Sequence, residues 1–288
     1  MIIAGALVTS NDAGLSVPDW PTSFGSFRMP RMVGGVKFEH GHRMVAGVVV
    51  ILTLILAGWL WRSEPRRWVR RLGAIAVLTI IAQAVLGGIT VLFFLPVDVS
   101  VAHACLAQAF FCIMVSLAVF TSPDWRWNEA KVKDASGLPM RKLALATTAL
   151  IFLQLMLGAA FRHHGFGIIP HVIGAGLVTF SVLWMLVRVL SDFRYQPGLK
   201  RPVWMLTGLL AAQVLLGIGS YWEVWSNLSA PQPLPPVVLV TTTHVAVGAL
   251  VLATSLALTF QAFRLIEPFE QNRRTEPVVS SARQSVIA

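Results

Sequence analysis

Seven long apolar stretches, separated by short polar segments, run along the chain from residue 41 to residue 263. Each has about 20 residues or more, the length that a helix needs to cross a hydrocarbon core roughly 30 Å thick. They cover residues 41–61, 72–95, 101–121, 142–161, 169–190, 202–221 and 238–263. The pattern predicts seven membrane-spanning helices.

A shorter apolar stretch opens the chain. Residues 1–8 (MIIAGALV) are too few to span a membrane, and they lack the basic segment with which a signal peptide begins. We expect them to be the last turns of a helix whose beginning is missing. The prediction is therefore an all-α integral membrane bundle of eight helices, the first of them truncated.

Composition and charge support this class of protein. The chain is 56% hydrophobic and only 12% charged, whereas soluble domains carry about a quarter charged residues. The net charge of +10 comes mainly from basic residues in alternate connecting segments. These segments are 62–71, 126–142, 188–201 and the tail from 264. By the positive-inside rule they and the C-terminus are predicted to be cytoplasmic, which argues against nucleic-acid binding as the reason for the charge.

Four of the seven histidines stand where a predicted helix begins, each on the side opposite the basic segments. They are His42, His103, His171 and His244. We therefore expect the four imidazoles at a similar depth, near the outer face of the membrane.

A short pattern repeats on the intervening helices. Gln-x-x-Leu-Gly occurs at 83–87, 154–158 and 213–217, and the truncated first helix retains Gly5 without the glutamine. Glycine and leucine are common in membrane helices, but three matches in register with the histidines favour duplication of a four-helix unit. We predict two pseudo-symmetric four-helix repeats. The predicted segments are an amino-terminal half (1–121), a cytoplasmic linker (122–141), a carboxy-terminal half (142–266) and a disordered cytoplasmic tail (267–288).

The histidines are candidate haem ligands. A single histidine within a membrane often only hydrogen-bonds to a neighbouring helix. Four at one depth, two per repeat, favour axial ligation of haem iron, because histidines on facing helices can hold one macrocycle from both sides. Pairing within each half joins His42 with His103 and His171 with His244. Zinc or copper is an alternative, although only the first pair has a nearby acidic ligand, Glu39.

Glu39 lies three residues before His42, on the same face of the predicted helix. Its carboxylate could accept a proton, steer water or orient the histidine. An ordinary acid at a helix N-terminus is the simpler interpretation. The second repeat has Ile168 at the position three before His171, so only one half carries an acid. This asymmetry favours one reactive haem site and one that transfers electrons.

Arginines near the outer side are candidates to pair with haem propionates, although anchoring of helix ends explains them as well. They are Arg28, Arg31, Arg43 and Arg162. We expect His163 and His164, in a short connecting segment, to be solvated.

Several motifs together resemble the haem A synthase family. They are Gly5-Ala-Leu-Val-Thr-Ser10, Ala13-Gly-Leu-Ser-Val-Pro-Asp-Trp-Pro21 and Glu39-x-x-His42-Arg43. His103, His171 and His244 fall where that family has its other three histidines, so the resemblance covers nearly the whole chain. Many members also carry a cysteine pair directly after Pro-Asp-Trp-Pro. Here residues 22–27 contain no cysteine, so a thiol relay of that kind is not expected.

The resemblance implies a particular reaction. It implies an oxidoreductase acting on CH or CH2 groups, which oxidises the C8 methyl of haem O to a formyl group through an alcohol, with water as the oxygen source. His42 and His103 would bind the substrate haem iron, and Glu39 would be catalytic. His171 and His244 would be the axial ligands of a haem b cofactor.

The resemblance also implies a setting. It places the chain as a multi-pass protein in the lipid of a bacterial plasma membrane, where haem A serves terminal oxidases. Haem O synthase and terminal oxidase assembly would be its partners, and the oligomeric state is left open. The main alternative is a bis-histidine cytochrome b that only carries electrons, and a more distant one is a haem or solute transporter.

Overall fold

The computed structural model describes residues 1–126, 131–134 and 138–267, and nearly all of its regular structure is helical. The helices are α1 (Ile2–Ser10), α2 (Val36–Ser63), α3 (Arg67–Leu92), α4 (Val97–Thr121), α5 (Pro123–Arg126), α6 (Met140–Arg162), α7 (Ile169–Asp192), α8 (Pro197–Ser226) and α9 (Pro235–Leu265). The predicted tail lies outside the described residues from 268 on, as does part of the predicted linker.

Seven of these helices, α2 to α4 and α6 to α9, are long and apolar enough to cross a membrane. The predicted all-α, multi-pass membrane fold is confirmed, with the short α5 as an additional element. Each spanning helix extends beyond the predicted apolar stretch at one end or both, but α3 ends at Leu92, before the predicted end at residue 95.

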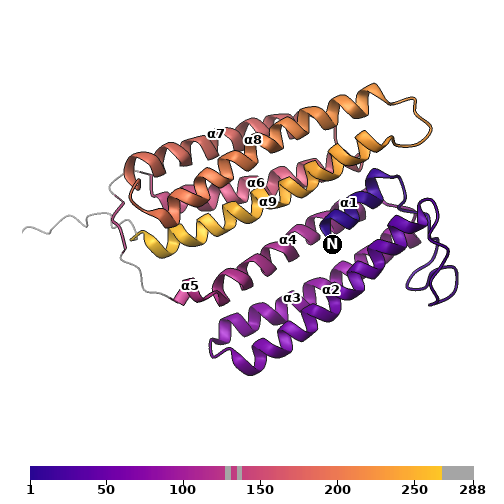
Figure 1. Cartoon of the computed structure of the whole chain (residues 1–288), viewed down its shortest axis with the longest axis horizontal. Coiled ribbons are helices and arrows are strands. Elements are labelled where there is room, and N and C mark those ends of the chain that lie inside the picture. Colours follow the sequence, from indigo (N-terminus) through magenta and orange to yellow (C-terminus); the bar gives the residue numbers. More distant parts are fainter. Residues whose placement is uncertain (127–130, 135–137, 268–288) are drawn as a thin grey trace, which may run out of the picture.

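The spanning helices lie side by side, and they alternate in direction (Figure 1). The loops 11–35 and 227–234 lie at one end of the bundle, which we call the loop end. The connections 64–66 and 193–196 and the carboxy-terminal end of α9 lie at the other, which we call the basic end. Each of α2, α4, α7 and α9 begins at the loop end, so their amino-terminal histidines gather there.

Contacts follow the order of the chain within α1–α4 and within α6–α9, and α6 also packs against α9. Between these two sets, α1 packs against α9, α4 against α6, and α4 against α9. The first helix of each set thus contacts the last helix of the other, as a two-fold axis along the membrane normal would produce. We propose the sequence boundaries 1–121 and 142–266 for the two halves on this basis.

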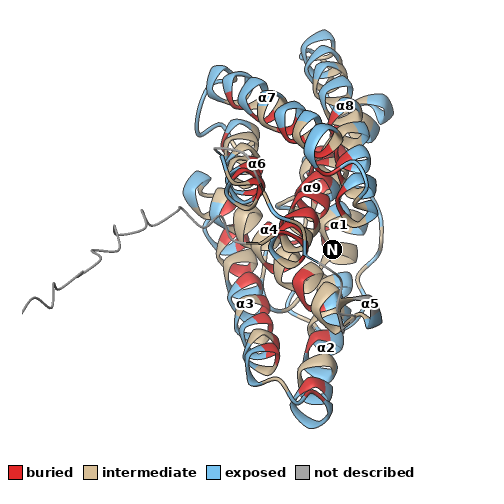
Figure 2. Ribbon diagram, turned by 90° about the vertical axis from the view of Figure 1, so that its left-hand side faces the viewer, coloured by how far each residue is buried: buried red, intermediate tan, exposed pale blue. Residues whose placement is uncertain are grey.

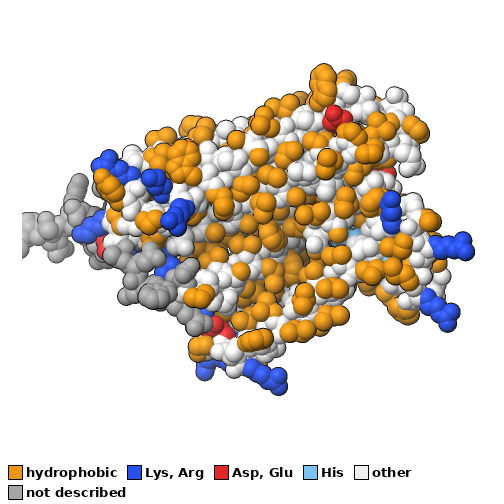
Figure 3. Space-filling view, in the orientation of Figure 1, with side chains coloured by type: hydrophobic (Ala, Val, Ile, Leu, Met, Phe, Trp, Pro, Cys, Tyr) orange, Lys and Arg blue, Asp and Glu red, His pale blue; other side chains and the backbone are white. Residues whose placement is uncertain are grey.

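Large apolar side chains cover the outside of the bundle. Trp59 and Leu215 are each 70% exposed, and hydrophobic side chains cover the middle of the face in Figure 3 while Lys and Arg gather at its two ends. Buried positions lie on the sides of helices that face one another (Figure 2). This distribution suits a protein whose surroundings are hydrocarbon in the middle and water at both ends.

Hydroxyl groups join α6 to α9 inside the carboxy-terminal set. Thr148 Oγ1 lies 2.7 Å from Ser255 Oγ and 2.8 Å from Thr259 Oγ1, and Thr259 Oγ1 also donates to the Ala144 carbonyl at 3.0 Å. In a membrane, apolar side chains gain little by leaving lipid for a protein interface, because both surroundings are apolar. Hydrogen bonds of this kind therefore help to hold the helices together.

Replacing Thr148 with valine removes this bridge at nearly constant volume. We expect the free energy of unfolding in detergent to fall by about 0.5–1.5 kcal/mol. Thr179→Val is the matched control, because the Thr179 hydroxyl bonds only the Ala175 carbonyl of its own helix. Equal stability of the two variants, measured by thermal unfolding, would contradict a role for the bridge.

Candidate functional site

Each of the four predicted ligand histidines lies against a glycine of the preceding helix. A β-carbon added to any of these glycines would come within 2.9–3.3 Å of the imidazole Cε1, closer than most side-chain contacts. The pairs are Gly5–His42 (3.3 Å), Gly87–His103 (3.0 Å), Gly158–His171 (2.9 Å) and Gly217–His244 (3.1 Å). The glycine of Gln-x-x-Leu-Gly therefore makes room for an imidazole ring.

The glutamine of the same pattern contacts the same histidine. Gln154 Nε2 lies 3.0 Å from His171 Nδ1 and donates to the His171 carbonyl at 2.8 Å. Gln83 Nε2 donates to the His103 carbonyl at 3.0 Å. Gln213 Nε2 lies 3.3 Å from His244 Nε2. The repeat of glutamine and glycine was visible in the sequence. Its spacing did not show that each glutamine contacts a histidine of the next helix.

His171 and His244 face one another between α7 and α9. Their ring centres are 6.5 Å apart and their planes are inclined by 77°. An iron atom ~2 Å from one nitrogen of each ring would place the ring centres about 6 Å apart. The spacing therefore fits one haem iron between the two imidazoles.

Several polar atoms around these rings are buried without a hydrogen-bond partner among the described residues. They are Nδ1 of His42, His103 and His244, and Oε1 of Gln83, Gln154 and Gln213. Unpartnered buried atoms are rare in folded proteins and often mark a site that a ligand completes. Within the described part of the chain no three His, Cys, Asp or Glu side chains gather as a bare metal ion would need. The donor set suits haem better than zinc or copper.

His42 and His103 lie close enough for their charges to interact. A third histidine, His163, approaches the same region from the end of α6, since the charge of His103 acts on it too. His164 is exposed, as expected, whereas His163 is half-buried and so only partly solvated. Burial is the main cause that lowers the pKa of His163 below its usual value, and the neighbouring charges of Arg162, His103 and His164 act in the same direction.

Glu39 and Arg43 fasten the loop 11–35 to α2. Glu39 is buried, and its Oε2 accepts the backbone N–H of Val17 at 2.7 Å. Its Oε1 accepts Arg43 Nη2 at 2.6 Å. Arg43 also donates to the carbonyls of Asp19 (2.7 Å), Thr22 (2.8 Å) and Val17 (3.1 Å). Both Nη atoms of Arg43 are engaged within the protein, so Arg43 is a weak candidate for a haem propionate.

The Pro-Asp-Trp-Pro segment forms the centre of this loop. Asp19 accepts the Thr22 hydroxyl and the backbone N–H groups of Phe24 (2.6 Å) and Gly25 (2.9 Å). The Thr22 hydroxyl and the Gly25 N–H are the main causes that lower the pKa of Asp19. The Trp20 ring lies against Gly88 of α3, where a β-carbon would come 2.5 Å from Cδ2. The loop is thereby attached to both α2 and α3.

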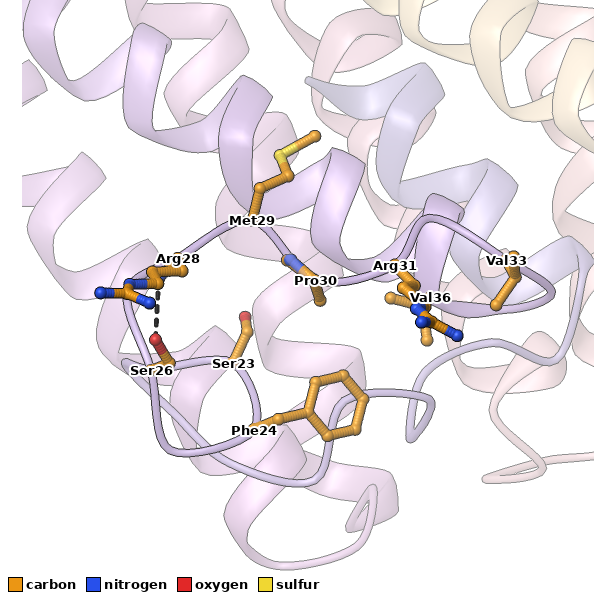
Figure 4. Close-up of a pocket in the computed structure, with 9 residues that line it drawn as sticks. All are labelled: Ser23, Phe24, Ser26, Arg28, Met29, Pro30, Arg31, Val33 and Val36. Carbon is orange, nitrogen blue, oxygen red and sulfur yellow. Dashed lines mark hydrogen bonds between the residues drawn. The ribbon is translucent and has the colours of Figure 1, made fainter.

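A shallow pocket lies on the outer side of this loop (Figure 4). Its lining comes from residues 23–33 and the first turn of α2, and it includes the exposed side chains of Arg28 and Arg31. His40, one turn along α2, pairs with the loop as well, because its Nδ1 lies 2.9 Å from Ser23 Oγ. The pocket is lined by loop residues rather than by the predicted ligand histidines, so we do not place a haem there.

Comparison with known proteins shows what part of the chain is similar to. Residues 36–170 match the family model COX15-CtaA, described as cytochrome oxidase assembly protein. The chain is 32% identical to the heme A synthase of Lysinibacillus sphaericus over 170 residues, covering 57% of this chain and 53% of that protein. It is 33% identical to the heme A synthase of Halalkalibacterium halodurans over 120 residues (41% and 38%). For that of Bacillus pumilus the figures are 29% over 167 residues (57% and 54%). The chain spans about half the length, or less, of these relatives.

The contact between glycine and imidazole can be tested by substitution. Gly158→Ala would force the His171 ring to move, and we expect a loss of about 1–3 kcal/mol in the free energy of unfolding. Gly176→Ala, where a β-carbon meets nothing within 4 Å, should be neutral or stabilising by up to about 1 kcal/mol because alanine favours helix. Thermal unfolding of the two variants in detergent compares them. A Gly158 variant as stable as the Gly176 variant would show that the ring has room to spare.

Proposed function

We propose that this chain is a haem A synthase, like the relatives that it matches, and that it oxidises the C8 methyl group of haem O to the formyl group of haem A. The conversion passes through an alcohol, takes one oxygen atom from water and releases four electrons and four protons to an acceptor. The proposal rests mainly on one observation. Four histidines, each packed against a glycine, form two pairs, and in the described residues the buried carboxylate of Glu39 lies three residues before a histidine of one pair only.

We propose that His171 and His244 hold a haem b cofactor and that His42 and His103 bind the iron of substrate haem O. The cofactor would supply one-electron redox chemistry when bound. The glutamines of α3, α6 and α8 would keep the histidines oriented toward the iron. The surrounding helices would exclude bulk water from both positions.

Glu39 is the proposed catalytic residue. Its carboxylate has about four lone-pair directions. Val17 and Arg43 use two of them, and the Ser16 backbone N–H also acts on the carboxylate. The remaining directions are available to a water molecule, from which Glu39 would accept a proton. Arg43 and the Val17 N–H would hold the carboxylate in place and offset its negative charge.

One observation favours the alternative of an electron-carrying cytochrome b. Glu39 is fully explained as a structural residue, because it fastens the outer loop together with Arg43. An electron carrier needs such a fastening and needs no proton acceptor. The two functions therefore differ in what removal of the carboxylate does to product formation.

We further propose the cellular setting that the sequence predicts. The chain would lie in a bacterial plasma membrane with its basic end and C-terminus in the cytoplasm. The histidines would then lie near the outer face. Haem O synthase would supply the substrate, and terminal oxidase assembly would receive the product.

Haem extraction from the purified chain, after co-expression with a source of haem O, tests the proposed function directly. We expect haem B together with haem O, its alcohol or haem A, separated by chromatography with mass detection. His171→Ala should lose haem B, whereas His164→Ala, in the exposed part of the loop, should retain it. Haem B alone, with no oxidised product in the membranes, would favour the electron carrier.

Glu39→Gln keeps the shape of the side chain and removes the proton acceptor. The single amide oxygen can still accept the hydrogen bond of Arg43 or that of Val17, but not both, so part of the fastening is lost as well. We expect the rate of haem A formation to fall by about 10²–10⁴-fold, with haem B retained. Arg43→Gln is the matched control, since it weakens the same fastening and leaves the carboxylate in place. Equal losses in both variants would assign Glu39 to the loop and not to the reaction.

A further inference from the structure

Arg162 is a partly buried cation without a matching anion. It is the last residue of α6, and its Nη2 donates to Ser10 Oγ at 2.8 Å. Its Nε is buried and has no hydrogen-bond partner among the described residues. No carboxylate of the described chain forms an ion pair with it within 4.0 Å. Its positive charge therefore has no ion-pair partner among the described residues.

The groups around Arg162 are neutral hydroxyls. Ser10 Oγ lies 2.9 Å from Thr241 Oγ1 and accepts the Thr242 hydroxyl at 3.1 Å. All three hydroxyl side chains are buried. Asp12 is the acid whose charge acts on Arg162, but Asp12 is exposed to solvent. A guanidinium in such a place is costly unless a ligand brings a negative charge.

The position of Arg162 points to the source of that charge. Its hydroxyl neighbours come from α1 and from the turn of α9 that precedes His244, and its charge acts on His244. The residue after it, His163, interacts with His103. Arg162 thus lies where the two helix sets meet, near both histidine pairs. Its hydroxyl neighbours on α9 precede His244, so its contacts favour the carboxy-terminal pair.

We propose that Arg162, supported by Ser10 and Thr242, binds a carboxylate of the porphyrin held by His171 and His244. This inference rests on the proposed function, because it needs a haem at that pair. Haem carries two propionate groups, and a guanidinium recognises a carboxylate through two parallel hydrogen bonds. The other arginines fit less well, since Arg28 and Arg31 are exposed in the outer loop and Arg43 is engaged with Glu39 and backbone carbonyls.

The test compares haem with its dimethyl ester, in which both carboxylates are neutralised. The full chain, freed of haem in detergent, is titrated with each probe, and binding is followed by the low-spin absorption spectrum. A His42→Ala, His103→Ala background limits binding to the carboxy-terminal pair. We expect haem to bind this background about tenfold to a hundredfold more tightly than the ester.

Arg162→Met should remove most of that preference for the free acid, and Arg162→Lys should retain part of it. Arg28→Met is the control and should leave the preference unchanged. The comparison of haem with ester on the unsubstituted Arg162 chain does not depend on whether an Arg162 variant folds, which circular dichroism checks separately.

The outcomes separate the inference from the proposed function. An unchanged preference in Arg162→Met, with haem still bound, overturns the inference and leaves the proposed function standing. The preference for haem over its ester could instead depend on Arg162 only in a His171→Ala, His244→Ala background. That result would assign the bound carboxylate to the porphyrin at His42 and His103, and it would also overturn the inference. Failure of the unsubstituted chain to bind haem overturns both.

Discussion

The close contact between an imidazole ring and a helix that lacks a β-carbon recurs four times in this protein, and the arrangement of the bundle depends on it. At each of these four contacts the imidazole ring occupies the space that a β-carbon would need. Because the four glycines lie near the loop end, the four histidines gather at that end of the bundle. The helices between them can then pack closely at other levels, through small residues and hydroxyl groups.

The two halves use this common framework differently. In the carboxy-terminal half His171 and His244 face one another at a distance that suits one iron atom. In the amino-terminal half the corresponding helix also carries Glu39 and Arg43, which hold the long outer loop over α2. A buried carboxylate beside one histidine pair, and isoleucine at the matching place beside the other, makes the halves chemically unequal within a nearly symmetric fold.

Low dielectric surroundings raise the importance of each polar group in such a structure. A hydrogen bond or a charge in the membrane interior has few alternatives to its partner in the protein. Glu39 and Arg43 satisfy one another, and Thr148 satisfies Ser255 and Thr259. Arg162 Nε and the ring nitrogens of His42, His103 and His244 are exceptions at the loop end, whereas Arg141 Nε is one at the basic end. Many, though not all, of the unsatisfied groups in the described residues thus lie near the glycine–histidine contacts.

Much of this could be predicted from the order of residues. Apolar length reveals the spans, because a membrane imposes one thickness on every helix. The alternation of basic segments indicates topology, and the four histidines and Glu39 follow from their register on those helices. Contacts between distant segments could not be predicted in this way. Three contacts join distant parts of the chain that hydrophobic periodicity does not relate. They are the hydrogen bonds of Arg43 to Asp19 and Thr22, the interaction of His163 with His103 and the contact of Arg162 with Ser10. Only packing in three dimensions brings them together, because which side chain faces which depends on how helices rotate and cross, and hydropathy carries little information about that.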